Sequence, residues 1–279
     1  PMRLALRGSR RADKIRCSAS LVEIVESDTM RESMEESGEI ALVAGASGGI
    51  GAAVVEALLG ETGISAVYAA SRSEEPPAGL AGRARLHWQH CDNSRAAIKN
   101  VVDRATRGNR SLTRVVVCNG MLHSDRCMPE KALGQIDPEC LQEVFAANAV
   151  VPMLWLQGVA RTLSRRQRCV IAVLSARVGS ITDNRLGGWY SYRSSKAALN
   201  MLLKSAAIEL ARRAPQSKLV AFHPGTTDTA LSKPFHSSVP EGKLFSPDFV
   251  AARLLGIMRE VRPDGELAYL DWDGKSIDW

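Results

Sequence analysis

Ile40-Ala-Leu-Val-Ala-Gly-Ala-Ser-Gly-Gly-Ile-Gly51 is the stretch of this 279-residue chain that decides its fold. Its first five residues form an apolar run as long as a buried strand, and a glycine turn separates them from a predicted helix over about 50–59. The start of such a helix offers free N–H groups and a positive dipole end, which bind phosphate. With a second strand at 66–70, the pattern predicts a dinucleotide-binding βαβ unit.

The alternation of strands and helices continues to the C-terminus. Further strands are expected at 84–90, 114–118, 169–174, 218–222 and 266–270, and helices at 94–107, 138–163, 189–213 and 247–261. This order predicts a single-domain α/β fold over residues 39–279: a doubly wound parallel sheet of the Rossmann type, with helices on both faces.

The first 38 residues differ from the rest. Residues 1–16 hold six basic side chains and one acidic one, and no sustained apolar periodicity follows up to residue 37. We expect a disordered N-terminal extension over 1–38. Organelle targeting by residues 1–20 and a translation start at Met30 or Met34 are the alternatives.

Composition narrows the function classes. The net charge of +6 and the pI of about 9.1 come from cations scattered among acids, which disfavours a nucleic-acid partner. An anionic cofactor accounts for part of the excess. We expect no membrane span, since no run approaches the roughly 18 apolar residues that a span needs.

Cysteine and histidine spacings suggest neither disulfides nor metals. The six cysteines show no CxxC pair and follow no secretory signal, so a reducing cytoplasm without disulfides is expected. His87 and His90 have a spacing unlike that of zinc ligands, and no metal site is predicted.

Tyr192 is the one tyrosine of the four with a lysine, Lys196, four residues on. Residues i and i+4 of a helix share a face, so the ammonium can lie beside the phenol and is expected to lower its pKa. Such a phenol can pass a proton to a carbonyl oxygen.

The chain resembles the short-chain dehydrogenases and reductases in two motifs, the glycines at 45, 49 and 51 and the pair Tyr192 and Lys196. Residues 187–200 and 273–279 are similar to the branch that includes C-factor and the sniffer-type carbonyl reductases. The resemblance implies a nicotinamide dinucleotide on the loop residues Gly45, Ser47, Gly48, Gly49, Ile50 and Gly51. It also implies a catalytic set of Asn148, Ser175, Tyr192 and Lys196, in which Asn148 orders a water and Lys196 also binds ribose hydroxyls.

The second strand ends in Ser71-Arg72 instead of a carboxylate. A guanidinium suits a 2′-phosphate, so NADP(H) is preferred over NAD(H), unless Arg72 points to solvent. Asp92 resembles the family's adenine-contacting aspartate, or else it caps the helix that begins near Arg95. The remaining cofactor contacts that the resemblance implies are Asn119, Gly120, Pro224, Gly225, Thr227 and Thr229.

The serine partner of Tyr192 has two candidates. Ser175 is favoured because it ends a predicted strand, where doubly wound sheets place their catalytic residues. Ser180 lies nearer to Tyr192 in sequence and is the alternative to Ser175. Residues 230–245 predict a mobile lid, or else a plain surface linker. Met121, Leu122, Trp189 and Phe235 suggest an apolar substrate pocket.

The predicted function is that of an NADP(H)-dependent oxidoreductase that transfers hydride between nicotinamide and a small carbonyl or alcohol substrate. The alternative is a dinucleotide-binding signalling or regulatory protein of the C-factor type with incidental turnover. Long helices at 138–163 and 189–213 resemble the surfaces that pair in family homodimers and homotetramers.

Overall fold

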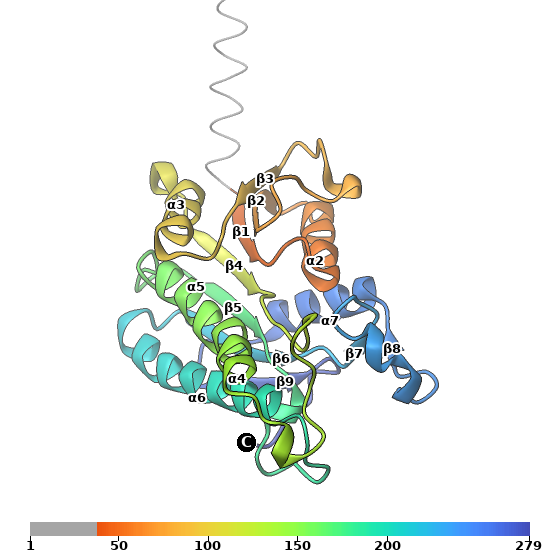
Figure 1. Cartoon of the computed structure of the whole chain (residues 1–279). Helices are drawn as coiled ribbons and strands as arrows, with labels where there is room; N and C mark the ends of the chain where they lie inside the picture. Colours follow the sequence, from red (N-terminus) through yellow and green to blue (C-terminus); the bar gives the residue numbers. More distant parts are fainter. Residues whose placement is uncertain (1–37) are drawn as a thin grey trace, which may run out of the picture. The chain divides into compact units, whose positions relative to one another are not determined.

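Seven parallel strands form the central sheet of the computed structural model, which describes residues 38–279 (Figure 1). Their order across the sheet is β3-β2-β1-β4-β5-β6-β9, so the chain winds outward in both directions from β1. The strands are β1 (Glu39–Ala44), β2 (Ile64–Ser71), β3 (Leu86–His90), β4 (Leu112–Val117), β5 (Cys169–Leu174), β6 (Ser217–His223) and β9 (Leu267–Asp271). The predicted fold class is confirmed, while the extension expected over 1–38 lies outside the described residues except for residue 38.

Helices cover both faces of the sheet. α2 (Gly49–Gly60) and α7 (Pro247–Glu260) pack against each other on one face. α3 (Arg95–Ala105), α5 (Val151–Ala160) and α6 (Tyr190–Arg213) lie on the other. β1 and β5 are buried on both faces, which explains why these strands are continuous apolar runs rather than alternating ones.

The helix expected over 138–163 is divided. α4 (Pro138–Phe145) passes through a π-helical turn, Ala146–Val150, before α5 begins. Taken together, α4, the π-helical turn and α5 (Pro138–Ala160) are long and apolar enough to cross a membrane by length and composition, contrary to the expectation that no segment comes close. Trp155, Leu156 and Val159 of this helix are buried in the core, and a core helix passes the same test.

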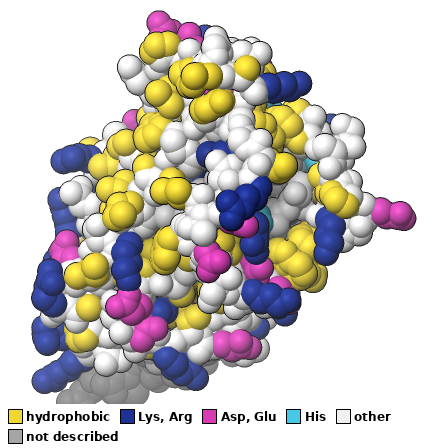
Figure 2. Space-filling model, turned by 90° about the horizontal axis from the view of Figure 1, so that it is seen from below, with side chains coloured by type: hydrophobic (Ala, Val, Ile, Leu, Met, Phe, Trp, Pro, Cys, Tyr) yellow, Lys and Arg dark blue, Asp and Glu magenta, His cyan; other side chains and the backbone are white. Residues whose placement is uncertain are grey.

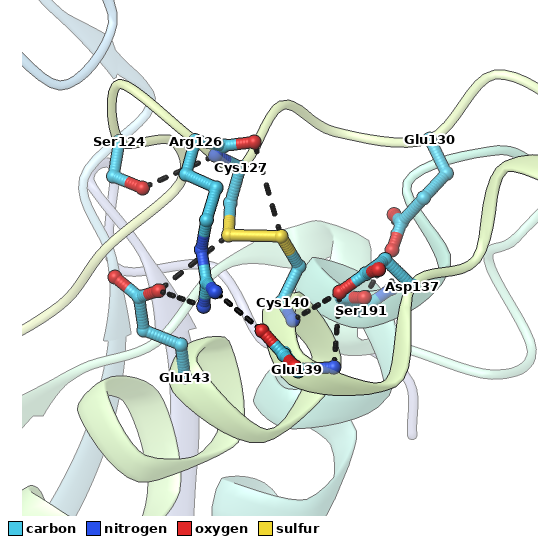
Figure 3. Close-up of a disulfide and its surroundings, with 9 residues drawn as sticks. All are labelled: Ser124, Arg126, Cys127, Glu130, Asp137, Glu139, Cys140, Glu143 and Ser191. Carbon is cyan, nitrogen blue, oxygen red and sulfur yellow. Dashed lines mark hydrogen bonds and ion pairs between the residues drawn. A yellow bond between two sulfur atoms is a disulfide. The ribbon is translucent and has the colours of Figure 1, made fainter.

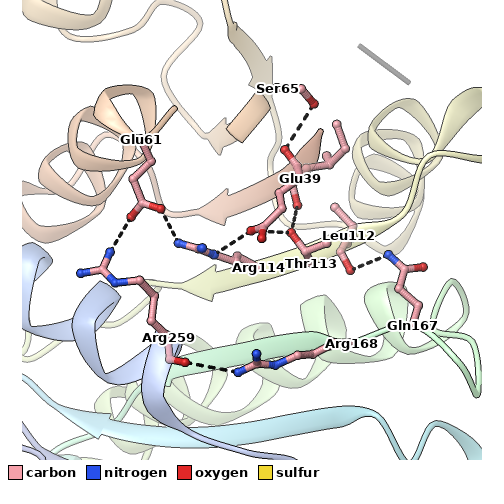
Figure 4. A network of polar contacts seen from close by, with 10 residues as sticks. Glu39, Glu61, Ser65, Leu112, Thr113, Arg114, Gln167, Arg168 and Arg259 are labelled. Carbon is pink, nitrogen blue, oxygen red and sulfur yellow. Dashed lines mark hydrogen bonds and ion pairs between the residues drawn. The ribbon is translucent and has the colours of Figure 1, made fainter. Parts of the chain in front are cut away.

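Arg114 forms ion pairs that connect the amino ends of the strands to the neighbouring helices. Its guanidinium contacts Glu39 of β1 at 3.0 Å and Glu61, just after α2, at 2.6 Å (Figure 4). Glu61 in turn pairs with Arg259 of α7 at 2.9 Å. This half-buried network lies at the edge of the sheet opposite to the carboxyl ends, so its role is structural.

Cys127 and Cys140 form a disulfide, with Cα atoms 5.5 Å apart (Figure 3). The expectation that the chain lacks disulfides is therefore wrong. Residues 13 apart have no recognisable spacing signal, and only the path of the irregular segment before α4 brings the two together. Cys91, Cys118 and Cys169 are free thiols, and burial raises the pKa of Cys118 and of Cys169 to about 12.

The charge excess is spread out on the face seen in Figure 2. There, Lys and Arg side chains lie among Asp, Glu and hydrophobic side chains and do not form one continuous stripe.

Candidate active site

Three adjoining cavities follow the carboxyl ends of the strands. They have volumes of about 550, 380 and 280 Å³. The first two share Gly45, Arg72 and Asn119, and the last two share Ser175 and Tyr192, so they form one cleft. Doubly wound sheets bind their ligands at this edge.

The glycine turn forms one end of the cleft. Gly45 has φ of +76°, a left-handed conformation that a side chain would disfavour. A Cβ at Gly51 would lie 2.2 Å from the carbonyl oxygen of Gly45, so only glycine permits this approach of helix to turn. Gly48 precedes α2 and no side chain caps the helix, which leaves its first N–H groups available to a phosphate. The turn therefore fits a dinucleotide.

The end of β2 holds hydroxyl groups and an exposed guanidinium. Ser71 Oγ donates to Ser47 Oγ at 2.7 Å, and both residues line the first cavity with Arg72. No carboxylate among residues 38–279 forms an ion pair with Arg72 within 4.0 Å, so its charge is available to an anion in the cleft.

Asp92 does not line any of these three cavities. Its carboxylate accepts from the Ser94 N–H at 2.8 Å, which lowers the pKa of Asp92, and Ser94 itself caps α3. The capping role that was the alternative for Asp92 therefore belongs to Ser94, and the adenine contact stays a prediction. The neighbouring Asn93 lines the first cavity with φ of 67°, and its Oδ1 accepts from Trp155 Nε1 at 2.9 Å. Asparagine tolerates the left-handed region better than most residues, a sequence signal for this turn.

Asn148 holds the segment after β4 by hydrogen bonds to its backbone. Its side chain is fully buried, accepts from the Met121 N–H at 2.7 Å and donates to the Met121 carbonyl at 2.8 Å and to Ser195 Oγ at 3.1 Å. Asn119 and Gly120 line the first two cavities, and Asn119 Oδ1 is buried with no hydrogen-bond partner among the described residues. A bound group could supply that partner.

Tyr192 and Lys196 both line the second cavity, as their spacing predicts. Lys196 Nζ lies 5.9 Å from the centre of the Tyr192 ring and donates to the Leu174 carbonyl at 2.8 Å. Burial raises the pKa of Tyr192 to about 12 and lowers that of Lys196 to about 8. The expectation of a lowered tyrosine pKa is therefore wrong, because burial disfavours the charged phenolate.

Ser175 lies beside Tyr192 in the second and third cavities. Its Oγ donates to Oδ1 of Asn200 at 2.6 Å, and Asn200 lies two helical turns after Tyr192 in α6. Ser180 is also buried, but its Oγ accepts from the Asp183 N–H at 3.0 Å and it lines none of the three cavities. The structure therefore brings Ser175, and not Ser180, to the tyrosine.

The third cavity is walled mainly by apolar and aromatic side chains. Leu122, Trp189 and Phe235 line it as predicted, whereas Met121 lines the first cavity. The Trp189 ring lies 5.1 Å from Phe235 and 6.1 Å from Tyr192, measured between centroids. The segment 230–245 borders the cavity through residues such as Leu231 and Phe235, in the position predicted for a lid.

The turn after β6 forms a further wall of the second and third cavities. Pro224, Gly225, Thr227 and Thr229 all line the third cavity, and Pro224 and Thr229 also line the second. A Cβ at Gly49 would lie 2.7 Å from the Thr229 methyl group. Gly49 is therefore required because the Thr229 side chain packs too close for a Cβ. The sequence predicted Gly49 for a different reason, the approach of the backbone to pyrophosphate.

His223 ends β6 beside this cavity, a position that sequence reasoning did not single out. Its Nδ1 is buried without a hydrogen-bond partner among the described residues. Burial, helped by the charge of Arg177 and opposed by Asp271, lowers the pKa of His223 to about 4. The imidazole is neutral at pH 7.

We expect the His223 imidazole to make stability depend on pH. Its folded pKa lies below the unfolded value, so between about pH 4 and 6.5 the unfolded chain binds more protons and the free energy of unfolding rises with pH. Between pH 7 and pH 4.5 the wild type should lose about 2 kcal/mol more than His223→Gln. Urea unfolding of both proteins at the two pH values measures this difference; equal losses would contradict the shift.

Sequence reasoning also passed over Asn200 and Glu130. Asn200 continues the Tyr192–Lys196 spacing by another four residues, so the helical period could have indicated it. Glu130 is only 5% exposed and contacts Ser191. The two residues are 61 positions apart, so no local sequence pattern could predict the contact.

Residues 39–239 match the short chain dehydrogenase family. The C-signal protein of Myxococcus xanthus is 31% identical over 152 residues, which cover 53% of this chain and 84% of that protein. A short-chain dehydrogenase/reductase from Burkholderia multivorans, solved with bound NADP, is 26% identical with a TM-score of 0.73, covering 87% of this chain and all of that one.

The NADPH-bound carbonyl reductase from chicken fatty liver has the same fold. Its TM-score is 0.70 at 23% identity, with 87% of this chain and 99% of that one covered. Together with the family match over most of the described residues, these likenesses agree with the fold described above. The chain belongs to the short-chain dehydrogenase family of oxidoreductases.

Proposed function

We propose that this protein is an NADP(H)-dependent oxidoreductase that transfers hydride between nicotinamide and a carbonyl or alcohol group. The observation that carries the proposal is the position of Ser175 and Tyr192, which line both the cavity that reaches the glycine turn and the apolar third cavity. The cofactor supplies the hydride when bound, and the third cavity takes the substrate.

The cofactor would be held along the first two cavities. The uncapped start of α2 suits the pyrophosphate, and Ser47, Ser71 and Arg72 suit a 2′-phosphate at the end of β2. That strand end carries no carboxylate to accept from a ribose 2′-hydroxyl, which supports NADP(H) over NAD(H). The bound NADP of the Burkholderia structure adds support.

Tyr192 acts as the proton donor in carbonyl reduction. With a pKa raised to about 12, its phenol is protonated at neutral pH and ready to donate to a carbonyl oxygen. Lys196, three per cent exposed, places a positive charge near the phenol, which favours the phenolate left after donation.

Ser175 holds the substrate oxygen in the same step. Its proton is donated to Asn200 Oδ1, so the hydroxyl must turn toward the carbonyl oxygen when substrate enters. Asn148 keeps the Met121 segment in place at the side of the cleft, and the water relay remains a further part of the proposal.

Two measurements test this function. NADPH should raise the melting temperature of the protein more than NADH does at equal concentration, because only NADPH carries the 2′-phosphate. The protein should then oxidise NADPH in the presence of at least one member of a panel of apolar aldehydes and ketones. Equal stabilisation by the two cofactors would remove the NADP preference.

A second function is favoured by the likeness to C-signal: a dinucleotide-binding signalling protein whose turnover is incidental. NADPH binding without turnover on the whole carbonyl panel would support it. The first function accounts better for a tyrosine, a lysine and a serine gathered beside the apolar cavity, which a binding role does not need.

The two serines give a paired prediction. Ser175→Ala should lower kcat for carbonyl reduction by roughly 100-fold, because it removes a hydrogen bond to the developing oxyanion. Ser180→Ala should leave kcat within about threefold, since its hydroxyl serves the turn at Asp183. Steady-state kinetics of both variants decide between them: a large loss for Ser180→Ala with near-normal Ser175→Ala would reverse the assignment.

A further inference from the structure

Glu130 is a buried carboxylate that contacts the start of α6. It lies in the irregular segment between β4 and α4, and its side chain is turned toward Ser191 (Figure 3). One carboxylate oxygen accepts from the Ser191 N–H at 3.2 Å, and the other accepts from the Ser191 hydroxyl. The main-chain carbonyl of Glu130 accepts from the Trp189 N–H at 2.5 Å.

The start of α6 has no cap of its own. Trp189 precedes the helix in a left-handed conformation, with φ of 51°, and no side chain from within the helix caps it. The first turn contains no acidic residue. Ser191 is the second helical residue, whose N–H a capping side chain normally takes, and a carboxylate is favoured at this positive end of the dipole. Glu130 fills this role from 61 positions away.

The disulfide anchors the segment that carries Glu130. Cys127 lies three residues before Glu130 and is joined to Cys140 in the first turn of α4. Both cysteines, Glu130, Ser191 and Tyr192 border one small cavity. The cross-link thus lies next to the reacting phenol and limits how far Glu130 can move from the helix start.

We propose that Glu130, held in place by the Cys127–Cys140 disulfide, is a positioning residue for Tyr192. By binding the first turn of α6 it holds Tyr192 and the left-handed Trp189, whose ring forms part of the substrate cavity. Without the carboxylate, this turn frays and the phenol loses its place beside Ser175. The consequence for turnover rests on the proposed function, whereas the capping of the helix does not.

The first test measures the cap itself by hydrogen exchange of the backbone amides at 190–194, followed by mass spectrometry. In Glu130→Ala these amides should exchange roughly tenfold faster than in the wild type, the loss expected of a helix cap. Glu130→Gln keeps an acceptor for the Ser191 N–H and should recover part of the protection. Glu139→Gln is the matched control: this exposed carboxylate pairs with Arg126 nearby and should change nothing.

The kinetic readout separates positioning from general loss of stability. Glu130→Ala should lower kcat for carbonyl reduction roughly tenfold, while the Kd for NADPH stays within about twofold, and Glu130→Gln should lie between it and the wild type. Unchanged exchange at 190–194 in Glu130→Ala would overturn the cap. Faster exchange with unchanged kcat would overturn the positioning role. If the wild type reduces no carbonyl, the proposed function fails and exchange at 190–194 still decides the capping.

The second test addresses the disulfide. Dithiothreitol reduces the bond to two thiols and is itself oxidised to a cyclic disulfide, so exchange at 190–194 should rise severalfold after treatment. The double variant Cys127→Ser/Cys140→Ser should show the raised exchange without reductant and no further response to it. If neither treatment nor double variant changes the exchange, the disulfide does not hold Glu130.

Discussion

Tyr192→Phe should reduce the rate of carbonyl reduction by about a thousandfold, the range in which a positioned general acid contributes. The change removes only the phenolic oxygen and leaves the ring packed against Trp189, so the fold and the cleft should persist. Lys196, Asn119 and the glycine turn line the cofactor cavities independently of that oxygen, and the Kd for NADPH should stay within about threefold. Steady-state NADPH oxidation and a fluorescence titration measure the two quantities.

The control for this change is Tyr190→Phe. Tyr190 begins the same helix, two residues earlier, and lines none of the three cavities. Its variant should keep kcat within about twofold. Turnover in Tyr192→Phe comparable with that of Tyr190→Phe would remove Tyr192 from the mechanism, whereas loss of NADPH binding together with activity would show that the variant is disrupted rather than chemically disabled.

Arg72→Ala should weaken NADPH binding by roughly 30-fold and leave NADH binding almost unchanged. A charge-assisted hydrogen bond to a phosphate contributes about 1.5–3 kcal/mol, and only NADPH presents a phosphate at this end of the cleft. Arg72 is exposed and has no ion-pair partner among the described residues, so its removal costs the fold little. Titration of both variant and wild type with each cofactor gives four dissociation constants and the preference directly.

Arg166→Ala provides the matched loss of charge at the other edge of the molecule. Arg166 is an exposed side chain in the loop before β5, at the amino end of the strands. If both variants weaken NADPH equally, the effect comes from net charge and not from a phosphate site. Equal weakening of NADPH and NADH by Arg72→Ala would place Arg72 on a part of the cofactor that both share.

The fold was predictable because its signal is local. Most strands of the sheet are apolar runs ended by polar or glycine residues, β3 being the more polar exception, and each of the seven lies where it was expected, within a few residues at its ends. The main helices also lie where their sequence patterns predicted them, except at 146–150, where the chain makes a π-helical turn. That turn places Asn148 against Met121, a contact 27 residues apart that helical periodicity does not contain.

The sequence predicted which residues line the cleft, but it predicted their protonation states only in part. The glycine turn, Arg72, Ser175, Tyr192 and Lys196 meet along one cleft, because the carboxyl ends of parallel strands share an edge. The raised pKa of Tyr192 was not predictable, since it depends on how deeply the folded chain buries the phenol. The lining of the first cavity by Asn93, next to Asp92, was not predictable, because it depends on the left-handed turn after β3.

The sequence by itself determined the doubly wound sheet, the glycine turn before α2 and the helical pairing of Tyr192 with Lys196. These depend on apolar periodicity, on the backbone freedom of glycine and on i,i+4 spacing, all of which are written over a few adjacent residues. Only the tertiary structure decided that Ser175 and not Ser180 meets the tyrosine, that Cys127 joins Cys140, and that Glu130 caps the helix that carries the phenol. Those contacts join residues on separate elements, and their energies depend on burial, which exists only once the chain has folded.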